Sequence, residues 1–119
     1  MRALLFISFL IVSNSGVFAQ DCAKYKTGTF TIDAEGYENY VLKRTKKFQI
    51  ESTGNDKVKY KIEWIDDCSY KLMSRKKTGT IEDNDVFCEI VKTGEDFYVV
   101  KAWMDGSDNV FELRVDVLK

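Results

Sequence analysis

The stretch KVKYKIEWIDDCSYKLM, residues 57–73, decides the fold of this chain. Apolar residues alternate with charged ones before its central acidic turn and again after it, which is the period-two pattern of strands buried on one face. The stretch therefore predicts a β-hairpin. A three-residue loop, 65–67, pairs Trp64 with Cys68 and brings the two apolar faces together. In that loop we expect Asp67 to take the left-handed conformation.

The same alternation recurs on both sides of the hairpin, in short segments that are separated by turn-length loops. No stretch shows sustained helical periodicity, so the chain is predicted to be all-β, an antiparallel up-and-down meander of about eight strands. Pairing of the last strand with the first would remove both edges and give a closed or nearly closed barrel. An open sheet or a two-sheet sandwich remains an alternative. The expected interior residues are Phe30, Ile32, Tyr40, Leu42, Phe48, Ile50, Tyr60, Ile62, Trp64, Tyr70, Leu72, Tyr98, Phe111 and Leu113.

Residues 1–19 have the features of a signal peptide: an early Arg2, a short apolar run, and small residues ending at Ala19. The apolar run is too short to span a bilayer comfortably, so no membrane insertion is expected. Residues 20–119 then form a single β-barrel domain, and the protein is expected to be secreted, either extracellular or periplasmic. The formal net charge of −1 provides no overall attraction to anionic partners.

Three cysteines, Cys22, Cys68 and Cys88, follow the expected leader. In an up-and-down meander, Cys22 precedes the first strand and Cys68 follows the hairpin turn, so both lie at the same end of the barrel. A disulfide requires Cα atoms within about 7 Å, and the predicted bridge is therefore Cys22–Cys68. Cys88 points inward by parity and is expected to be a buried thiol, although pairing between chains stays open.

The chain contains no His, which excludes Ser-His-Asp and Cys-His catalysis and His-containing zinc sites. The acidic segments 82–85 and 105–109 lack the EF-hand spacing, so we expect no metal site and no cofactor. Paired carboxylates near the hairpin turn suit a solvated loop better than a hydrolase site. We predict no catalytic residues and no enzyme activity.

Basic residues gather on strands two to four of the meander, and they are expected on its outer surface with the apolar residues on the opposite face. A surface for nucleic acid would carry aromatic side chains between the charges, so no nucleic-acid partner is expected. The basic residues are Lys43, Arg44, Lys46, Lys47, Lys57, Lys59 and Lys61.

Two segments, CAKYKTGTF (22–30) and KYKIEWIDDCSYKLM (59–73), resemble small secreted lipocalin-like β proteins of Bacteroidota-type bacteria, whose function is poorly characterised. Gly28-Thr29-Phe30 is also similar to the Gly-x-Trp of the lipocalin and fatty-acid-binding superfamily, with Phe in place of Trp. The resemblance implies a lipocalin-like barrel, but it carries over no binding residues.

The leading functional hypothesis is a secreted, non-enzymatic barrel that binds a small apolar or amphipathic ligand. Buried tyrosine hydroxyls require partners, and a few such groups can orient an amphipathic ligand in an apolar cavity. The expected lining residues are Tyr60, Trp64 and Tyr70. The alternative is a secreted interaction or structural module with a solid β core, which would act through its loops or the outer surface around Trp103; no protein partner is identified.

Overall fold

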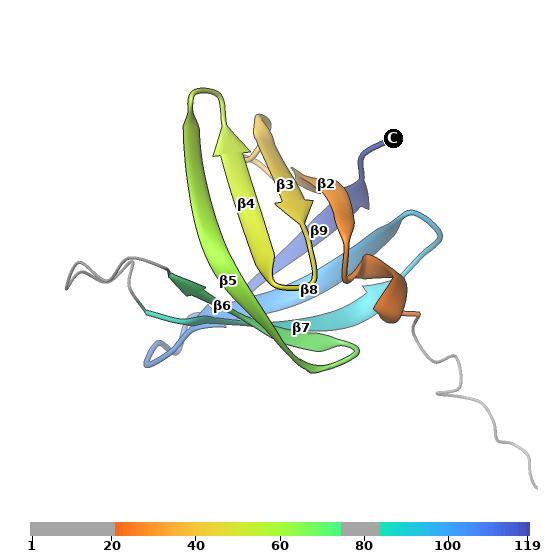
Figure 1. The fold of residues 1–119 in the computed structure, drawn as a ribbon. Helices are drawn as coiled ribbons and strands as arrows, with labels where there is room; N and C mark the ends of the chain where they lie inside the picture. The colour runs from red at the N-terminus through yellow and green to blue at the C-terminus, as the bar shows by residue number, and fades with distance from the viewer. Residues whose placement is uncertain (1–20, 75–83) are drawn as a thin grey trace, which may run out of the picture.

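A computed structural model describes residues 21–74 and 84–119 of the chain. Each strand pairs antiparallel with the next in sequence, and β9 pairs with β2, which closes the barrel (Figure 1). The predicted all-β meander and its closure are confirmed, so the open sheet and the sandwich do not apply. The described elements are η3 (Ala23–Tyr25), β2 (Gly28–Asp33), β3 (Tyr40–Arg44), β4 (Phe48–Thr53), β5 (Asp56–Asp66), β6 (Ser69–Ser74), β7 (Val86–Thr93), β8 (Phe97–Met104) and β9 (Phe111–Val117).

The hairpin β5–β6 has the predicted faces but a different register. Trp64 pairs with Tyr70 instead of Cys68, and a bulge follows Trp64. Asp66 pairs with Ser69, and its Oδ1 accepts a hydrogen bond of 2.9 Å from the backbone N–H of Cys68. This side-chain turn requires no left-handed residue, and every non-glycine residue of the described segments has a negative φ. The prediction of a left-handed Asp67 was therefore wrong. The predicted faces of the two strands are nevertheless correct, because the observed register differs from the predicted one by an even number of residues.

The β3–β4 turn gives strand β4 the opposite orientation from the expected one, so that the other set of its side chains faces inward. The N–H of Thr45 donates to the carbonyl of Phe48 at 2.9 Å, so only two residues form the turn, and Arg44 pairs with Gln49. The Thr45 hydroxyl accepts a further bond of 3.1 Å from the N–H of Phe48, which favours this tight turn. As a result Gln49 points inward, and the inward placement expected for Phe48 and Ile50 was wrong.

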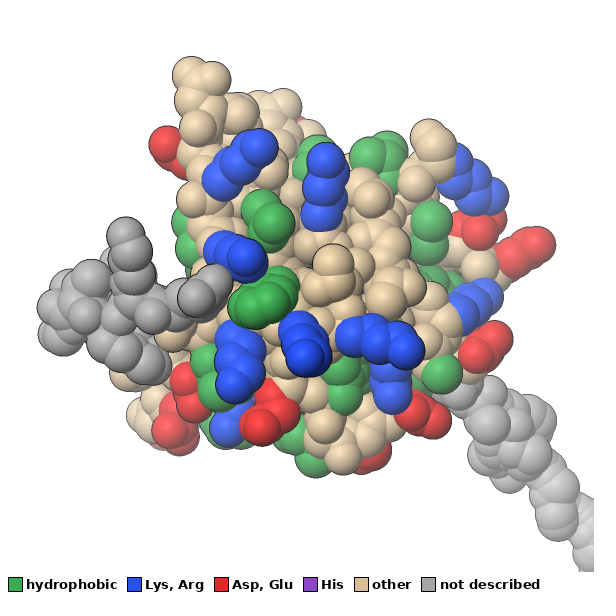
Figure 2. Space-filling view, viewed as in Figure 1, with side chains coloured by type: hydrophobic (Ala, Val, Ile, Leu, Met, Phe, Trp, Pro, Cys, Tyr) green, Lys and Arg blue, Asp and Glu red, His purple; other side chains and the backbone are tan. Residues whose placement is uncertain are grey.

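The outer surface of β3 to β5 consequently combines lysines with apolar side chains. Figure 2 shows blue cationic side chains around green apolar ones over β4 and β5. Lys59 Nζ lies 4.2 Å from the ring centroid of Phe48. Arg44 is absent from this surface, because it is 4% exposed and lies inside the barrel. The expected separation of apolar and basic residues onto opposite faces was therefore wrong here, and so was the outer position of Arg44.

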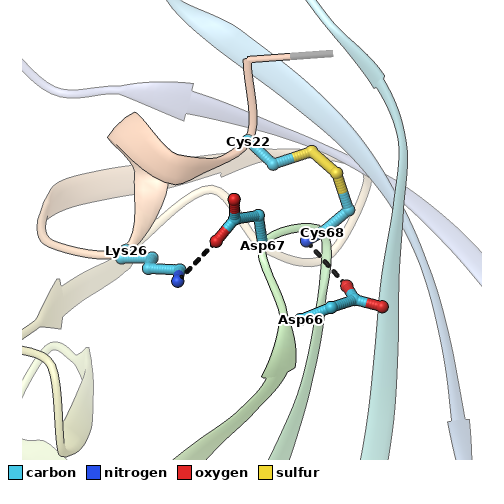
Figure 3. Close-up of a disulfide and its surroundings, with 5 residues drawn as sticks. All are labelled: Cys22, Lys26, Asp66, Asp67 and Cys68. Atoms are coloured by element: carbon cyan, nitrogen blue, oxygen red, sulfur yellow. Dashed lines mark hydrogen bonds and ion pairs between the residues drawn. A yellow bond between two sulfur atoms is a disulfide. The ribbon is translucent and has the colours of Figure 1, made fainter. Parts of the chain in front are cut away.

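The predicted disulfide closes one end of the barrel. Cys22 and Cys68 are bridged with a Cα–Cα distance of 5.1 Å, and Lys26 Nζ lies 2.8 Å from Asp67 Oδ1 beside the bridge (Figure 3). The bridge anchors η3, whose Tyr25 is 1% exposed. The Tyr25 hydroxyl lies 2.8 Å and 2.9 Å from the carbonyl oxygens of Gly94 and Phe97 at the turn between β7 and β8. Tyr25 thus belongs to a plug at this end, and the first strand, β2, begins after it at Gly28.

Two expectations fall outside the described residues: the signal peptide at 1–19 and the first half of the acidic segment 82–85. Within residues 21–74 and 84–119, no three His, Cys, Asp or Glu side chains gather in a way that could hold a metal ion. In the same part of the chain, no helix has the length and apolar character needed to cross a membrane.

Candidate ligand-binding cavity

A cavity of about 270 Å³ occupies the barrel interior. It extends from Arg44 near the disulfide end, past a belt of aliphatic side chains, to Tyr37 and Phe111 near the opposite end. Because each strand alternates its side chains, all eight strands contribute to one continuous wall. The residues that line the cavity are Ile32, Tyr37, Leu42, Arg44, Gln49, Glu51, Tyr60, Tyr70, Leu72, Val86, Cys88, Tyr98, Val100, Ala102, Met104, Phe111, Leu113 and Val115.

The floor of the cavity is built around the buried guanidinium of Arg44. Its Nε donates to Gln49 Oε1 at 2.9 Å, and one terminal nitrogen donates to the Tyr25 carbonyl at 2.9 Å. The other terminal nitrogen donates to the Tyr98 hydroxyl at 2.9 Å and, more weakly, to that of Tyr70 at 3.4 Å. Arg44 therefore joins β3, β4, β6, β8 and the plug at one point.

Aromatic rings complete the environment of this charge. The guanidinium carbon lies 4.7 Å from the ring centroid of Phe30, 4.9 Å from Tyr70 and 5.7 Å from Tyr98. No carboxylate of the described segments lies within ion-pair distance of Arg44. Hydrogen bonds and ring faces therefore stabilise a buried cation that would otherwise be expensive to desolvate.

A polar stripe runs along β4 from this floor toward the other end of the barrel. Gln49, which is 2% exposed, accepts from Arg44 and donates through Nε2 to Glu51 Oε2 at 3.1 Å. Burial raises the pKa of Glu51, and it outweighs the hydrogen bond from Gln49 and the charge of Arg44, which lower it. A strand that directs Gln and Glu inward and Phe and Ile outward departs from the usual pattern, as functional sites often do.

Tyrosines surround the cavity where the polar stripe ends. Tyr60 on β5 and Tyr37, in the segment before β3, both line the cavity, and the rings of Tyr37 and Tyr40 meet edge to face at 4.7 Å. Burial raises the pKa of Tyr60, and the nearby Glu51 and Tyr40 raise it further. This end of the cavity is thus aromatic, with one carboxylate in its wall.

The three residues expected to bind ligand occupy different positions. Tyr60 and Tyr70 line the cavity at its two ends, whereas Trp64 does not line it. The Trp64 ring packs against Tyr70 at 4.6 Å, with Lys26 Nζ 5.3 Å from its centroid, toward the disulfide end. Sequence reasoning missed Arg44, Gln49 and Glu51. Leu42 was expected to face inward, and side chains two residues apart on a strand share a face. Arg44 on the same strand could therefore have been predicted to face inward as well.

Cys88 is the free cysteine of the described residues, and it is buried. Burial raises the pKa of the Cys88 thiol to about 12 and outweighs the nearby charge of Arg44, which lowers it. At pH 8 the thiol is then almost entirely protonated. We expect iodoacetamide to modify Cys88 at least about 100-fold more slowly in the native protein than in urea, because the thiolate is the nucleophile. Mass spectrometry measures both rates, and equal rates would contradict the buried position.

No family model, no curated protein and no solved structure matches this chain. The architecture itself, an eight-stranded antiparallel up-and-down closed barrel, is consistent with a lipocalin-like fold.

Proposed function

We propose that this protein is a secreted, non-enzymatic barrel that binds a small amphipathic molecule in its interior. The cavity of about 270 Å³, with an aliphatic belt between two polar ends, is the observation that supports this proposal. Small-molecule sites commonly combine a largely apolar wall with a few placed polar groups. The disulfide between Cys22 and Cys68 agrees with an oxidising destination.

The size of the cavity favours a compact ligand. Sites for drug-sized molecules typically measure about 300–1,000 Å³, and this cavity lies just below that range. A long acyl chain would extend beyond the aliphatic belt, whereas a molecule with one or two rings would fill it. A cavity of this size disfavours the alternative of a solid β core.

Filling the cavity is expected to abolish binding without harming the fold. Ala102 lies on β8 in the cavity wall, and Ala102→Phe would place a ring where the ligand is proposed to bind. We expect the variant to lose the fluorescence enhancement of N-phenyl-1-naphthylamine, a neutral apolar probe. Its free energy of unfolding should stay within about 1 kcal/mol of the parent, because the ring enters existing space.

The matched control is Lys101→Phe, which adds the same ring at the exposed neighbouring position on β8. This control should bind the probe like the parent protein. If the parent protein fails to bind the probe, or if Ala102→Phe destabilises by about 1–3 kcal/mol as in an overpacked core, the interior is solid and the proposal fails.

One observation favours a second role on the outside of the barrel. The rings of Phe87 and Trp103 stack on the outer surface of β7 and β8, with centroids 6.0 Å apart and an interplanar angle of 19°. Both side chains are half-buried, and aromatic residues are enriched in contact surfaces between proteins. Loss of a copurifying partner on Trp103→Ala, with unchanged probe binding, would support such an interaction.

A further inference from the structure

Glu51 is the carboxylate of the cavity wall, and aromatic side chains flank it on both sides. On β5, Tyr60 pairs with Gln49, so it is the diagonal neighbour of Glu51 on the interior face. On β3, Leu42 pairs with Glu51, so Tyr40 is the diagonal neighbour on the other side. Diagonal neighbours lie about 7–8 Å apart, within reach of aromatic side chains. Tyr37 adds a third ring through its edge contact with Tyr40.

The carboxylate has unused capacity to bind a ligand. Its Oε2 accepts a hydrogen bond from Gln49, and among the described residues Oε1 accepts none. A carboxylate has about four lone-pair sites, so a donor that enters the cavity can bind to Glu51 without displacing a protein group. Arg44 differs in this respect, because four of its hydrogen bonds are already made to the protein.

The combination of a carboxylate with aromatic rings is suited to a cation. Ring faces attract ammonium groups, more strongly when water is excluded, and charge-assisted hydrogen bonds to a carboxylate are about twice as strong as neutral ones. The aliphatic belt can hold the rest of the ligand, because Leu72, Val100 and Val115 line the same cavity as Glu51.

We propose that Glu51, with Tyr37 and Tyr60, binds the protonated amino group of a small organic amine whose apolar body lies in the aliphatic belt. This inference rests on the proposed ligand-binding function and specifies the class of ligand. An ammonium placed at Glu51 would donate to the carboxylate oxygen that, among the described residues, accepts no hydrogen bond.

A matched series of ligands tests the inference. Tryptamine, tryptophol and indole-3-acetate share one indole ring and carry a cationic, a neutral and an anionic side chain at pH 7. Each is titrated against the protein loaded with N-phenyl-1-naphthylamine, and displacement gives its dissociation constant. We expect tryptamine to bind at least about 10-fold more tightly than tryptophol, which corresponds to about 1.4 kcal/mol, and indole-3-acetate to bind most weakly.

Substitutions then assign the preference to Glu51 and the rings. Glu51→Gln should remove the preference for tryptamine over tryptophol, and Glu89→Gln, which removes the same charge from the exposed face of β7, should keep it. Tyr60→Leu should reduce the preference several-fold, whereas Tyr60→Phe should retain it because the ring is preserved. Because burial raises the pKa of Glu51, ionisation of this carboxyl costs more in the fold than in the unfolded chain, and Glu51→Gln should unfold at the same or a higher temperature at pH 7.

The outcomes separate this inference from the proposed function. Probe binding with equal affinity for tryptamine and tryptophol, or with tighter binding of indole-3-acetate, would overturn the amine site and leave the ligand-binding barrel intact. A preference that persists in Glu51→Gln would also overturn it. Absence of probe binding to the parent protein would overturn the proposed function instead, and a Glu51→Gln variant that unfolds at a clearly lower temperature would indicate a structural role for the carboxylate.

Discussion

Replacing Arg44 by methionine is expected to lower the free energy of unfolding by about 3–5 kcal/mol, because buried acceptors lose their donor together. Gln49 Oε1, the Tyr25 carbonyl and the Tyr98 hydroxyl each accept a bond of 2.9 Å from the guanidinium. A buried acceptor without a partner costs about 1–3 kcal/mol. The loss is a large share of the stability of a single domain, which is about 5–15 kcal/mol.

Urea denaturation monitored by far-UV circular dichroism measures this effect. The matched control is Lys43→Met, because Lys43 is the exposed neighbour on β3 and its substitution should change stability by less than about 0.5 kcal/mol. Arg44→Lys should fall between the two, since an ammonium keeps the charge but cannot bond four partners in the geometry of a planar fork. A loss below about 1 kcal/mol for Arg44→Met would show that the network contributes little.

Removing the disulfide with Cys22→Ser and Cys68→Ser is expected to destabilise the protein by about 4 kcal/mol. The bridge spans 46 residues, and in the chain-entropy account a closed loop of that length restricts the unfolded chain by this amount. The bridge also anchors η3, so its loss frees Tyr25 from its contacts with the carbonyls of Gly94 and Phe97.

Thermal unfolding with and without dithiothreitol gives the same comparison without mutation. The reductant should lower the midpoint of the parent protein and leave that of the double serine variant unchanged. Cys88→Ala serves as the control, because Cys88 is free and buried, and this variant should retain its response to the reductant. A midpoint in the parent that does not respond to reduction would contradict the role of the bridge.

The two perturbations should not be additive. Arg44 donates to the Tyr25 carbonyl, and Tyr25 is held by the element that the disulfide anchors. Sites that share a partner commonly show coupling of about 0.5–3 kcal/mol. The combined variant should therefore lose less stability than the sum of the separate losses, since either change alone already loosens Tyr25.

Much of the fold follows from local patterns that the sequence displays directly. Alternation along residues 57–73 predicts a hairpin with the correct faces, and similar alternation predicts the later strands. Short connections force antiparallel neighbours. Closure of β9 onto β2 and the Cys22–Cys68 bridge follow from the order of the strands, because an up-and-down meander assigns each turn to one end of the barrel.

The cavity chemistry could not be read in the same way. The face of β4 depends on whether the turn before it is even or odd, and the hydrogen bond from Thr45 to Phe48 selects the two-residue turn. A change of one residue in the length of this turn places Gln49 and Glu51 on the interior face instead of Phe48 and Ile50. Hydrophobicity alone favours the opposite choice, so the pattern that identified most of the strands misled at this one.

By itself the sequence determined the strand order, the faces of most strands and the disulfide, because these depend on alternation and turn position along the chain. Only the tertiary structure decided that Arg44, Gln49 and Glu51 share the interior. A buried Arg is tolerable where acceptors and ring faces converge on it, and these come from β2, β4, β6, β8 and the plug. Partners so distant in sequence meet only once the barrel has closed.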